Sequence, residues 1–390
     1  MCIRDRRYSK QSNDWWKSAV FYQIYPRSFY DSNNDGIGDL KGVVEKLDHL
    51  NDGNGGGLGI DAIWLSPFFP SPQADFGYDV SDYCDVDPIF GSLKDFDSLV
   101  SESHKRRIKV VIDLVLNHSS DQHPWFAESR QNRTNDKADW YVWVDPDPDG
   151  NPPNNWLAVF GGAAWTYEPQ RKQYFLHNFL PEQPDLNWYN PEVREALAEV
   201  IRFWMNRGVD GFRLDTANYY AFDRQLRDNP KRQEGSEILE DGQEANPLSA
   251  YITKYSKDRP ENLEFIKFLR KIFDEKEHIT SIGEIGSGEG LDSTLRLGAD
   301  YVKRKDGLHL AYTFALLGEK MNADYFDQVT EITEEAIEDG WPCWSLSNHD
   351  CKRMMTRYKC FAEREGYHQM MLLLMLSLRG TPIILSLIHI

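Results

Sequence analysis

The stretch IKVVIDLVLNH, residues 108–118, decides the fold class of this 390-residue chain. It is a nearly continuous apolar run that ends in Asn117 and His118, and such runs are typical of strands buried on both faces of a parallel sheet. Seven other β-rich runs occur, several of them also nearly continuous apolar runs, and each is followed by a helical or loop segment. The eight runs are residues 19–27, 60–67, 108–118, 209–215, 279–284, 308–314, 342–350 and 381–385.

Helical segments connect several of these runs. In residues 191–208, apolar side chains recur at helical spacing between Pro191 at the start and Gly208 at the end. Similar segments are 39–50, 93–107 and 261–277. Eight alternating strand and helix units predict an α/β protein with a (β/α)8 TIM barrel, which needs about 250 residues.

The residues beyond those of a barrel lie in two places. An inserted subdomain is expected after the third strand, at residues 119–190, because one β/α unit takes only roughly 30 residues. The predicted domains are therefore 8–118 as the first part of the barrel, 119–190 as the insertion and 191–385 as the remainder. The charged segment 224–260 is expected to form a long loop over the same face of the barrel.

The chain is strongly acidic, with 44 Lys and Arg against 62 Asp and Glu and a net charge of −18. Such a surface repels phosphate backbones and anionic lipids, so no nucleic-acid or membrane partner is expected. The apolar runs 370–378 and 382–390 are each shorter than the roughly 20 residues of a membrane span, and they predict a buried helix and a buried strand. Five cysteines without a CxxC pair, and no visible secretory signal, favour a cytoplasmic protein with free thiols. We expect it to be a monomer.

Polar and charged side chains gather at the C-terminal ends of four predicted strands. The third run ends in His118, the fourth in Asp215, the fifth in Glu284 and the seventh in Asp350. In a barrel these ends meet at one face, where active sites form. Arg213 and Asp215 lie two residues apart, so their side chains point the same way, and the guanidinium favours the ionised carboxylate that a nucleophile needs. The alternative, that each carboxylate only caps a helix or forms a local ion pair, accounts poorly for four strands that end in this way.

Five motifs follow one another along the chain: DLVLNH (113–118), QPDLN (183–187), GFRLDTAN (211–218), GEIG (283–286) and SNHD (347–350). In sequence and order they resemble the motifs of the α-amylase superfamily of glycoside hydrolases, in particular its α-glucosidase and oligo-1,6-glucosidase branch. The segments WWKSAVFYQIYPRSFYDSNNDGIGDLKG (15–42) and DFGYDVSDY (75–83) are similar to the same branch. The resemblance runs from about Trp15 to Leu385.

This resemblance implies roles for individual residues. Asp215 matches the nucleophile, Glu284 the general acid/base, and Asp350 a third carboxylate that stabilises the transition state and holds the sugar. The other matched residues surround the terminal glucose in the family: Asp75, Tyr78, His118, Arg213 and His349. Among them, Tyr78 matches the aromatic platform under the sugar ring and Asp75 a hydroxyl ligand. Glu284, which is near two other carboxylates, is expected to stay protonated as a general acid must.

The resemblance implies a retaining α-glucosidase that hydrolyses α-glucosidic bonds, mainly α-1,4, of small oligosaccharides from the non-reducing end. In the resembled branch, the residue after the nucleophile tends to be Val in α-1,6-acting enzymes and Thr or another small residue in α-1,4-acting ones, and here it is Thr216. On a strand Thr216 alternates away from Asp215, so we expect it in the wall near the leaving sugar. Two alternatives stay open: a trehalose-forming or sucrose-acting transglycosylase, and an inactive truncated or non-catalytic relative.

The segment DSNNDGIGD (31–39) predicts a metal site. Its oxygen-bearing side chains fall at positions 1, 3, 5 and 9, with glycine at position 6, and Ca²⁺ prefers such a ring of oxygens. The expected ligands are Asp31, Asn33, Asp35, Asp39 and the main-chain carbonyl of Ile37. The resemblance favours a structural Ca²⁺, with Mg²⁺ as the alternative metal. An Asp/Asn turn that needs no ion is the other interpretation.

Both ends of the chain depart from the resembled pattern. Residues 1–7 and the final SLIHI (386–390) fit poorly, and we expect them to be foreign and the reading frame to be truncated. The C-terminal β domain of the resembled enzymes is therefore expected to be missing from this chain. An incomplete barrel is expected to expose apolar surface on its eighth strand and its first helix.

Overall fold

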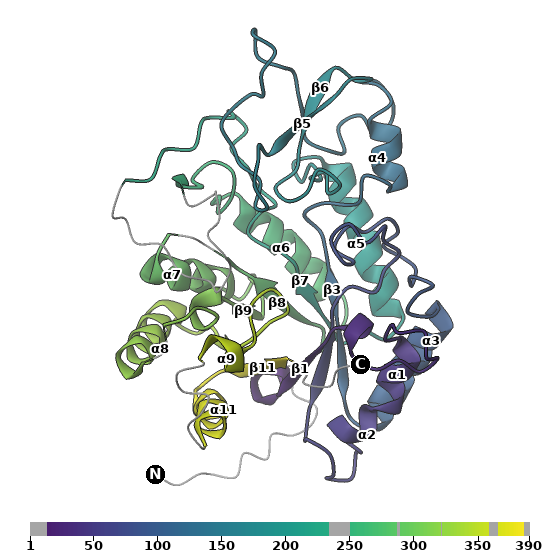
Figure 1. Cartoon of the computed structure of the whole chain (residues 1–390), viewed down its shortest axis with the longest axis vertical. Coiled ribbons are helices and arrows are strands. Elements are labelled where there is room, and N and C mark those ends of the chain that lie inside the picture. The colour runs from purple at the N-terminus through teal and green to yellow at the C-terminus, as the bar shows by residue number, and fades with distance from the viewer. Residues whose placement is uncertain (1–13, 234–249, 287–288, 321, 359–365, 386–390) are drawn as a thin grey trace.

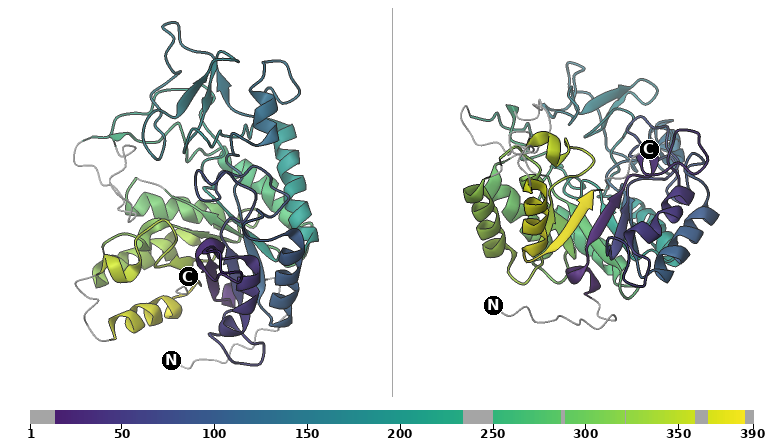
Figure 2. Two further views of the ribbon diagram at one scale, coloured as in Figure 1. Left: turned by 45° about the vertical axis from the view of Figure 1, so that its right-hand side comes forward. Right: turned by 60° about the horizontal axis from the view of Figure 1, so that its bottom comes forward.

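The computed structural model describes residues 14–233, 250–286, 289–320, 322–358 and 366–385, and the ends expected to be foreign, 1–7 and 386–390, lie outside these ranges. Eight parallel strands form one sheet in the order β10–β11–β1–β2–β3–β7–β8–β9, which curls into a nearly closed TIM barrel (Figures 1 and 2). Their bounds are β1 Phe21–Ile24, β2 Ala62–Leu65, β3 Lys109–Leu114, β7 Gly211–Leu214, β8 Thr280–Glu284, β9 Leu310–Tyr312, β10 Cys343–Ser345 and β11 Thr381–Leu385. Each predicted run contains one of these strands, which confirms the predicted fold class.

Helices cover the outside of the barrel (Figure 2). The main ones are α1 Leu40–Glu45, α2 Leu47–Leu50, α3 Leu93–Lys105, α5 Pro191–Asn206, α6 Asn262–Phe273, α7 Leu291–Val302, α8 Ala323–Ile337, α9 Met354–Arg357 and α11 Tyr367–Ser377, and the 3-10 helix η1 Trp15–Ser18 precedes β1. Helix α5 begins as predicted, because the Asn190 side chain accepts the Glu192 N–H at 2.9 Å. The predicted helix 39–50 is instead two short helices, since the backbone leaves helical geometry at Lys46. Within the described ranges no helix is long and apolar enough to cross a membrane.

Between β3 and β7 the chain leaves the barrel and forms a small antiparallel sheet. Its strands are β4 Trp143–Val144, β5 Trp165–Glu168 and β6 Gln173–Leu176, in the order β4–β6–β5, preceded by helix α4 Pro124–Ser129. This region projects beyond the barrel (Figure 1). An isolated bridge between His118 and Asp185 ties it to the chain just after β3. The sheet lies within the predicted insertion, whose boundaries 119–190 stay a prediction.

Side chains from facing strands fill the interior of the barrel. Trp64 of β2, Ile282 of β8 and Tyr312 of β9 belong to one buried cluster. Arg213 of β7 is also completely buried, and its guanidinium carbon lies 4.9 Å from the centre of the Trp64 ring. A charged group is stable at such a position only if it is paired.

The apolar run 370–378 forms most of α11, but this helix is not the buried helix that the sequence predicted. Met371 and Met375 are its buried residues, whereas Leu373 is 68% exposed and Met370 is 52% exposed. The helix is apolar on all sides, so a barrel that covers one side leaves the others in solvent. The exposed apolar surface therefore lies on α11, and the expectation that it lies on the eighth strand and first helix is wrong. Strand β11 and the apolar face of α1 are buried.

Candidate active site

Three carboxylates surround one guanidinium inside the barrel. Arg213 Nη1 lies 2.6 Å from Asp215 Oδ1 and 2.9 Å from Asp113 Oδ1. Its Nη2 lies 2.7 Å from Glu284 Oε2. Arg213 and Asp113 have no exposed surface, and Asp215 and Glu284 are 6% and 5% exposed. We call these four residues the Arg213 cluster.

Strand register places the members of the Arg213 cluster. Asp113 of β3 is the direct partner of Arg213 of β7 in the sheet. Glu284 is the last residue of β8, which pairs with β7 as far as Leu214 and Gly283. The structure thus brings Arg213, Asp215 and Glu284 together, as the strand-end pattern predicted. Their catalytic roles stay predictions.

The Arg213 cluster carries more negative than positive charge, because three carboxylates share one cation. Burial raises the pKa of Asp215, and Glu284 and Asp113 add to this effect while Arg213 opposes it. The expectation that Arg213 keeps Asp215 ionised is therefore too simple, since the same cation also serves Asp113 and Glu284. A buried group of this composition favours retention of a proton, and a general acid requires a proton.

Thr216 contacts two carboxylates of the Arg213 cluster. Its backbone N–H donates to Glu284 Oε2 at 3.1 Å, and its hydroxyl donates to Asp215 Oδ2 at 3.2 Å. The expectation that Thr216 points away from Asp215 is wrong, because β7 ends at Leu214 and Thr216 has a φ of 42°, outside strand geometry. A β-branched residue in this region is strained, and such strain is typical of functional sites.

A series of hydrogen bonds links His349 to the Arg213 cluster. Gln23 Nε2 donates to His349 Nδ1 at 2.8 Å, so the imidazole proton sits on Nε2, which lies 2.5 Å from Tyr78 Oη. The Tyr78 hydroxyl donates to Asp113 Oδ2 at 3.1 Å. The rings of Tyr78 and His349 are stacked with their centres 5.4 Å apart. Burial lowers the pKa of His349 to about 4, so this imidazole is neutral at pH 7.

Gln183 joins Asp75 to His118. Its Nε2 donates to Asp75 Oδ2 at 2.9 Å and lies 3.0 Å from His118 Nε2. Burial raises the pKa of Asp75 to about 6 and lowers the pKa of His118 to about 3. A neutral imidazole and a weakly acidic carboxyl group are suited to hydrogen bonds with hydroxyl groups.

Asp350 lies nearer to solvent than the other predicted carboxylates. Its side chain is 35% exposed, its Oδ1 lies 3.4 Å from His349 Nε2, and its Oδ2 accepts from Asn348 Nδ2 at 3.0 Å. The charge of Asp350 also contributes to the raised pKa of Asp75, which places these two residues within electrostatic reach. All eight predicted catalytic and sugar-binding residues therefore belong to one region at the C-terminal ends of the strands.

This arrangement has counterparts among known proteins. Residues 23–386 match the alpha amylase catalytic domain. The chain belongs to the alpha-amylase family.

Three proteins named as glucosidases or a glucosyl transfer enzyme are similar to this chain over most of its length. A probable alpha-glucosidase of Rhizobium meliloti (strain 1021) is 50% identical over 94% of this chain and 66% of its own length. An oligo-1,6-glucosidase of Heyndrickxia coagulans is 39% identical over 88% of this chain and 61% of its own length. The crystal structure of an alpha-glucosyl transfer enzyme has a TM-score of 0.89 and 49% identity, with coverage of 95% of this chain and 68% of that one. The chain thus spans 61–66% of the length of these two curated relatives.

Asp113 was not predicted as a site residue, although it is the first residue of the DLVLNH motif. A carboxylate inside an apolar strand needs a charged or hydrogen-bonding partner when both faces of the strand are buried, and this signal could have revealed it. Gln23, inside an apolar strand, carries the same signal. Tyr312 carries none, yet its hydroxyl accepts from Arg213 Nη2 at 3.0 Å and lies 3.2 Å from Glu284 Oε1.

The predicted metal ligands lie in a loop, residues 31–39, that is exposed at 33–36 and supplies its own hydrogen bonds. Asp31 Oδ1 accepts the N–H of Asn34 at 2.6 Å, and its Oδ2 accepts the N–H of Gly36 at 2.8 Å. Asp35 Oδ1 accepts the N–H of Ile37 at 2.8 Å.

Asp39, the last predicted metal ligand, is turned towards α1. It accepts the Gly42 N–H at 2.7 Å and caps the helix, and it also accepts from the Ser32 hydroxyl. The oxygen donors of residues 31–39 fit the ligand chemistry of Ca²⁺. In the part of the chain that the structure describes, no group of three or more His, Cys, Asp or Glu side chains is arranged to hold a metal. The metal site therefore stays a prediction.

Proposed function

We propose that this alpha-amylase family member is a retaining α-glucosidase that removes glucose from the non-reducing end of small α-linked oligosaccharides. The observation that carries the proposal is that Asp215 and Glu284 lie 2.6 Å and 2.7 Å from two nitrogens of the Arg213 guanidinium. Retaining enzymes need two carboxyl groups about 5–5.5 Å apart, whereas inverting enzymes need about 6.5–9.5 Å. Two ion pairs to one small planar group favour the shorter spacing.

The proposed reaction has two steps. Glu284 gives a proton to the glycosidic oxygen while Asp215 attacks the anomeric carbon, so the bond to the leaving sugar breaks and a glycosyl ester forms. Glu284 then takes a proton from water, whose oxygen attacks the anomeric carbon and releases Asp215 as a carboxylate. Arg213 contacts both residues and provides a fixed positive charge beside the groups whose charges change.

We further propose that Asp75, Tyr78, His118, His349 and Asp350 bind the terminal glucose. The Tyr78 ring offers an apolar face to the sugar, and its stacking on His349 fixes its orientation. The neutral imidazoles and the carboxyl groups offer donors and acceptors to the sugar hydroxyls. The partly exposed Asp350 side chain is accessible to a sugar that enters from solvent.

The proposed preference for α-1,4 linkages rests on Thr216. Its hydroxyl and N–H contact both proposed catalytic carboxylates, so Thr216 borders the reacting centre. One polar contact of this kind is worth roughly 0.5–1.5 kcal/mol, a factor of about ten at most in rate. We therefore expect kcat/KM to be higher for maltose than for isomaltose. The proposed action on small oligosaccharides separately predicts a low kcat/KM for soluble starch.

Product analysis tests this proposal. Proton NMR of fresh p-nitrophenyl α-glucoside digests should show α-glucose before mutarotation, and β-glucose as the first product would contradict retention. A 5-fluoro-α-glucosyl fluoride, which slows breakdown of the glycosyl ester, should label Asp215 in peptide mass spectra. Isomaltose preferred by tenfold would contradict the linkage assignment, and starch preferred over maltose would contradict the preference for small substrates.

Glucosyl transfer is the second candidate function. It uses the same glycosyl ester, with a sugar hydroxyl in place of water, and the alpha-glucosyl transfer enzyme at 49% identity supports it. Digests at high maltose concentration separate the two, because transfer yields trisaccharides whereas hydrolysis yields glucose alone.

We propose four further properties of this protein. They are a structural Ca²⁺ held by residues 31–39, a monomeric state, a cytoplasmic location, and no nucleic-acid or membrane partner. The net charge of −18 and the unbridged thiols of Cys84 and Cys343 support the last three.

A further inference from the structure

Tyr312 lies beside Glu284, and the proposed two-step reaction gives its hydroxyl group no role. Tyr312 is the last residue of β9, and in the sheet it is the direct partner of Glu284, the last residue of β8. It is only 1% exposed. A polar group that is buried to this extent needs hydrogen-bond partners, and the partners of Tyr312 belong to the Arg213 cluster.

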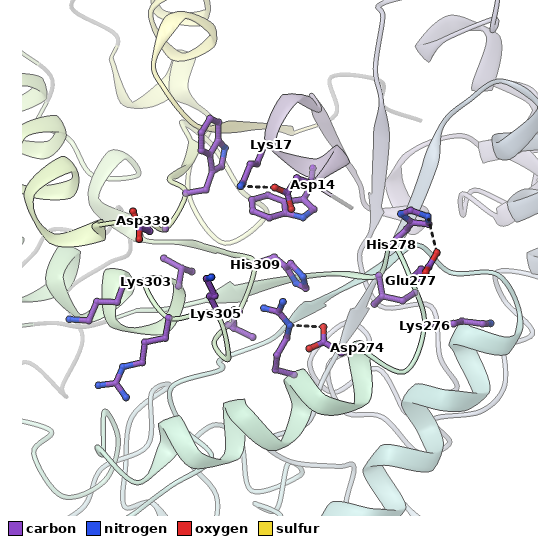
Figure 3. Close-up of a pocket in the computed structure, with 18 residues that line it drawn as sticks. Asp14, Lys17, Asp274, Lys276, Glu277, His278, Lys303, Lys305, His309 and Asp339 are labelled. Carbon is purple, nitrogen blue, oxygen red and sulfur yellow. Dashed lines mark hydrogen bonds and ion pairs between the residues drawn. The ribbon is translucent and has the colours of Figure 1, made fainter. Parts of the chain in front are cut away.

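The register of β8 against β9 is fixed near the starts of the two strands. The Ser281 backbone N–H donates to His309 Nδ1 at 3.1 Å, and the His309 backbone N–H donates to Ser281 Oγ at 3.1 Å. His309 lines a cavity of about 590 Å³ at the end of the barrel where β8 and β9 begin, opposite the Arg213 cluster (Figure 3). A slip of one residue would break both bonds and turn Tyr312 to the other face of the sheet. The sheet therefore holds Tyr312 beside Glu284, and removal of the hydroxyl group alone should not move the ring.

The two carboxylate oxygens of Glu284 have different surroundings. Oε2 lies 2.7 Å from Arg213 Nη2 and accepts the Thr216 N–H at 3.1 Å. Oε1 accepts from the Tyr312 hydroxyl at 3.2 Å, and within the described ranges no other hydrogen bond reaches it. A proton on Oε2 would face a cation and an N–H group, neither of which can accept it. The proton that a general acid needs therefore belongs on Oε1.

Arg213 fixes the direction of the hydrogen bond between Tyr312 and Glu284. A guanidinium group can only donate, so Tyr312 Oη accepts from Arg213 Nη2 at 3.0 Å. The proton of the phenol is therefore left for Glu284 Oε1. Burial raises the pKa of Tyr312 well above its ordinary value, and Arg213 opposes this effect while Glu284 adds to it. The Tyr312 hydroxyl is thus a donor to Glu284 throughout the neutral pH range.

We infer that Tyr312 is a positioning residue for Glu284, whose Oε1 gives up and takes back the catalytic proton while it accepts the Tyr312 hydroxyl. This inference rests on the proposed glycosidase function. In the first step Oε1 passes its proton to the glycosidic oxygen, and in the second it takes a proton from the attacking water. The phenolic proton stays on Tyr312 in both steps. Because a hydrogen bond to an ionised acceptor is stronger than one to a neutral acceptor, Tyr312 favours the ionised form of Glu284 and makes it a stronger acid.

The pH dependence of kcat/KM for maltose in Tyr312→Phe tests this inference. The upper limb of the profile reports the loss of the Glu284 proton in the free enzyme. Because the substitution removes a donor to the ionised form, this limb should move to higher pH by about one unit. At the optimum, kcat/KM for maltose should fall about tenfold. For α-glucosyl fluoride it should fall by less than about twofold, because fluoride leaves with little help from an acid.

Tyr301 in α7 provides the matched control. It is also 1% exposed, and its hydroxyl accepts from Asn262 Nδ2 at 2.8 Å. Tyr301→Phe therefore removes an equally buried hydroxyl, and it should leave the upper limb and the ratio of the two substrates unchanged. Equal profiles for Tyr312→Phe and Tyr301→Phe, or equal losses of Tyr312→Phe with maltose and with α-glucosyl fluoride, would overturn the inference. If the unsubstituted chain hydrolyses neither substrate, the proposed function fails and this inference fails with it, so the two failures are distinguishable.

Discussion

The Arg213 cluster and the loop 31–39 are both rich in carboxylates, but they are built in opposite ways. In the Arg213 cluster the carboxylates are buried, and three strands bring them to one shared cation. In the loop Asp35 is exposed, Asp31 is half-buried and Asp39 is buried. Asp31 and Asp35 accept hydrogen bonds from their own backbone segment, such as the Gly36 N–H to Asp31 at 2.8 Å. The cluster depends on the whole barrel, whereas the loop depends mainly on nine consecutive residues.

The protonation of the two groups differs accordingly. Burial raises the pKa of Asp215, helped by Glu284. For Asp31 burial is the largest single effect and raises the pKa, but several backbone N–H groups, led by that of Gly36, together outweigh it, so the pKa of Asp31 is lowered. The comparison teaches that burial favours the protonated form of a carboxyl group, so the Arg213 charge must oppose burial for Asp215 to act as a nucleophile, whereas backbone donors keep a carboxylate ionised and fit it for a cation.

Removal of Asp215 gives the largest expected effect. Asp215→Ala should lower kcat by about 10⁴-fold or more, because the glycosyl ester can no longer form. The measurement is steady-state hydrolysis of p-nitrophenyl α-glucoside, with Asp147→Ala as the control. Asp147 is half-buried in a loop remote in sequence from the Arg213 cluster and accepts the Asn151 N–H at 2.7 Å, and its loss should leave kcat unchanged. An Asp215→Ala enzyme with more than a tenth of the starting activity would contradict the assignment.

The second prediction concerns the cation that the buried carboxylates share. Arg213→Met should cost about 3–5 kcal/mol of unfolding free energy at pH 7, because it leaves buried carboxylates without a positive partner. The loss should be smaller at pH 5, since protonation of these carboxylates removes the repulsion.

Urea unfolding measures this loss, and a half-buried arginine whose partner is exposed provides the control. Arg207 lies 2.7 Å from Asp97, whose side chain is 51% exposed, and Arg207→Met should cost at most about 1 kcal/mol. Equal losses for the two variants would show that burial does not distinguish the Arg213 cluster from the protein surface.

Asp185 extends the comparison to a buried carboxylate that has no cationic partner among the residues that the structure describes. It accepts the Asn178 N–H at 3.0 Å and contacts Asn117 Nδ2 at 3.2 Å, and burial raises its pKa to about 7. The folded state therefore holds this proton more tightly than the unfolded state, whose pKa is about 3.9. The stability from Asp185 is complete below about pH 4 and is lost as the pH rises to about 7, by roughly 1.4 kcal/mol for each unit of the raised pKa. The decline of unfolding free energy between pH 4 and 7 should be shallower in Asp185→Asn, and identical slopes would exclude Asp185 as the cause.

The sequence predicted those parts of the molecule that depend on local pattern. The apolar runs with polar ends identified all eight strands. They also predicted that Arg213, Asp215 and Glu284 lie at one face of the barrel. Asp113 was within reach of the same reasoning, because a carboxylate in a buried strand requires a partner.

Other features depend on contacts that no local pattern contains. Asp113 shares the Arg213 cation with Asp215 because of the register of β3 against β7. The direction in which the pKa of Asp215 shifts was therefore not predictable from the sequence. The position of Thr216 follows from a backbone that leaves the strand after Leu214. The exposure of α11 depends on what packs against a helix that is apolar on all sides.

The smallest expected effect concerns the loop 31–39 and tests the other half of the comparison. If its ionised carboxylates hold Ca²⁺, a chelator should lower the melting temperature by about 2–4 °C, because an ion that binds only the folded state stabilises it by mass action. Asp31→Ala should abolish this response. Asp52→Ala should keep it, since Asp52 is half-buried like Asp31 and accepts the Asn54 and Gly56 N–H groups at 2.8 and 2.9 Å, but lies outside the loop. Scanning calorimetry with and without chelator, together with elemental analysis, measures both effects. Absence of a bound metal and of any shift would leave the loop as a turn held by its own hydrogen bonds, and acidic residues in this pattern would then indicate a backbone motif and not a cation site.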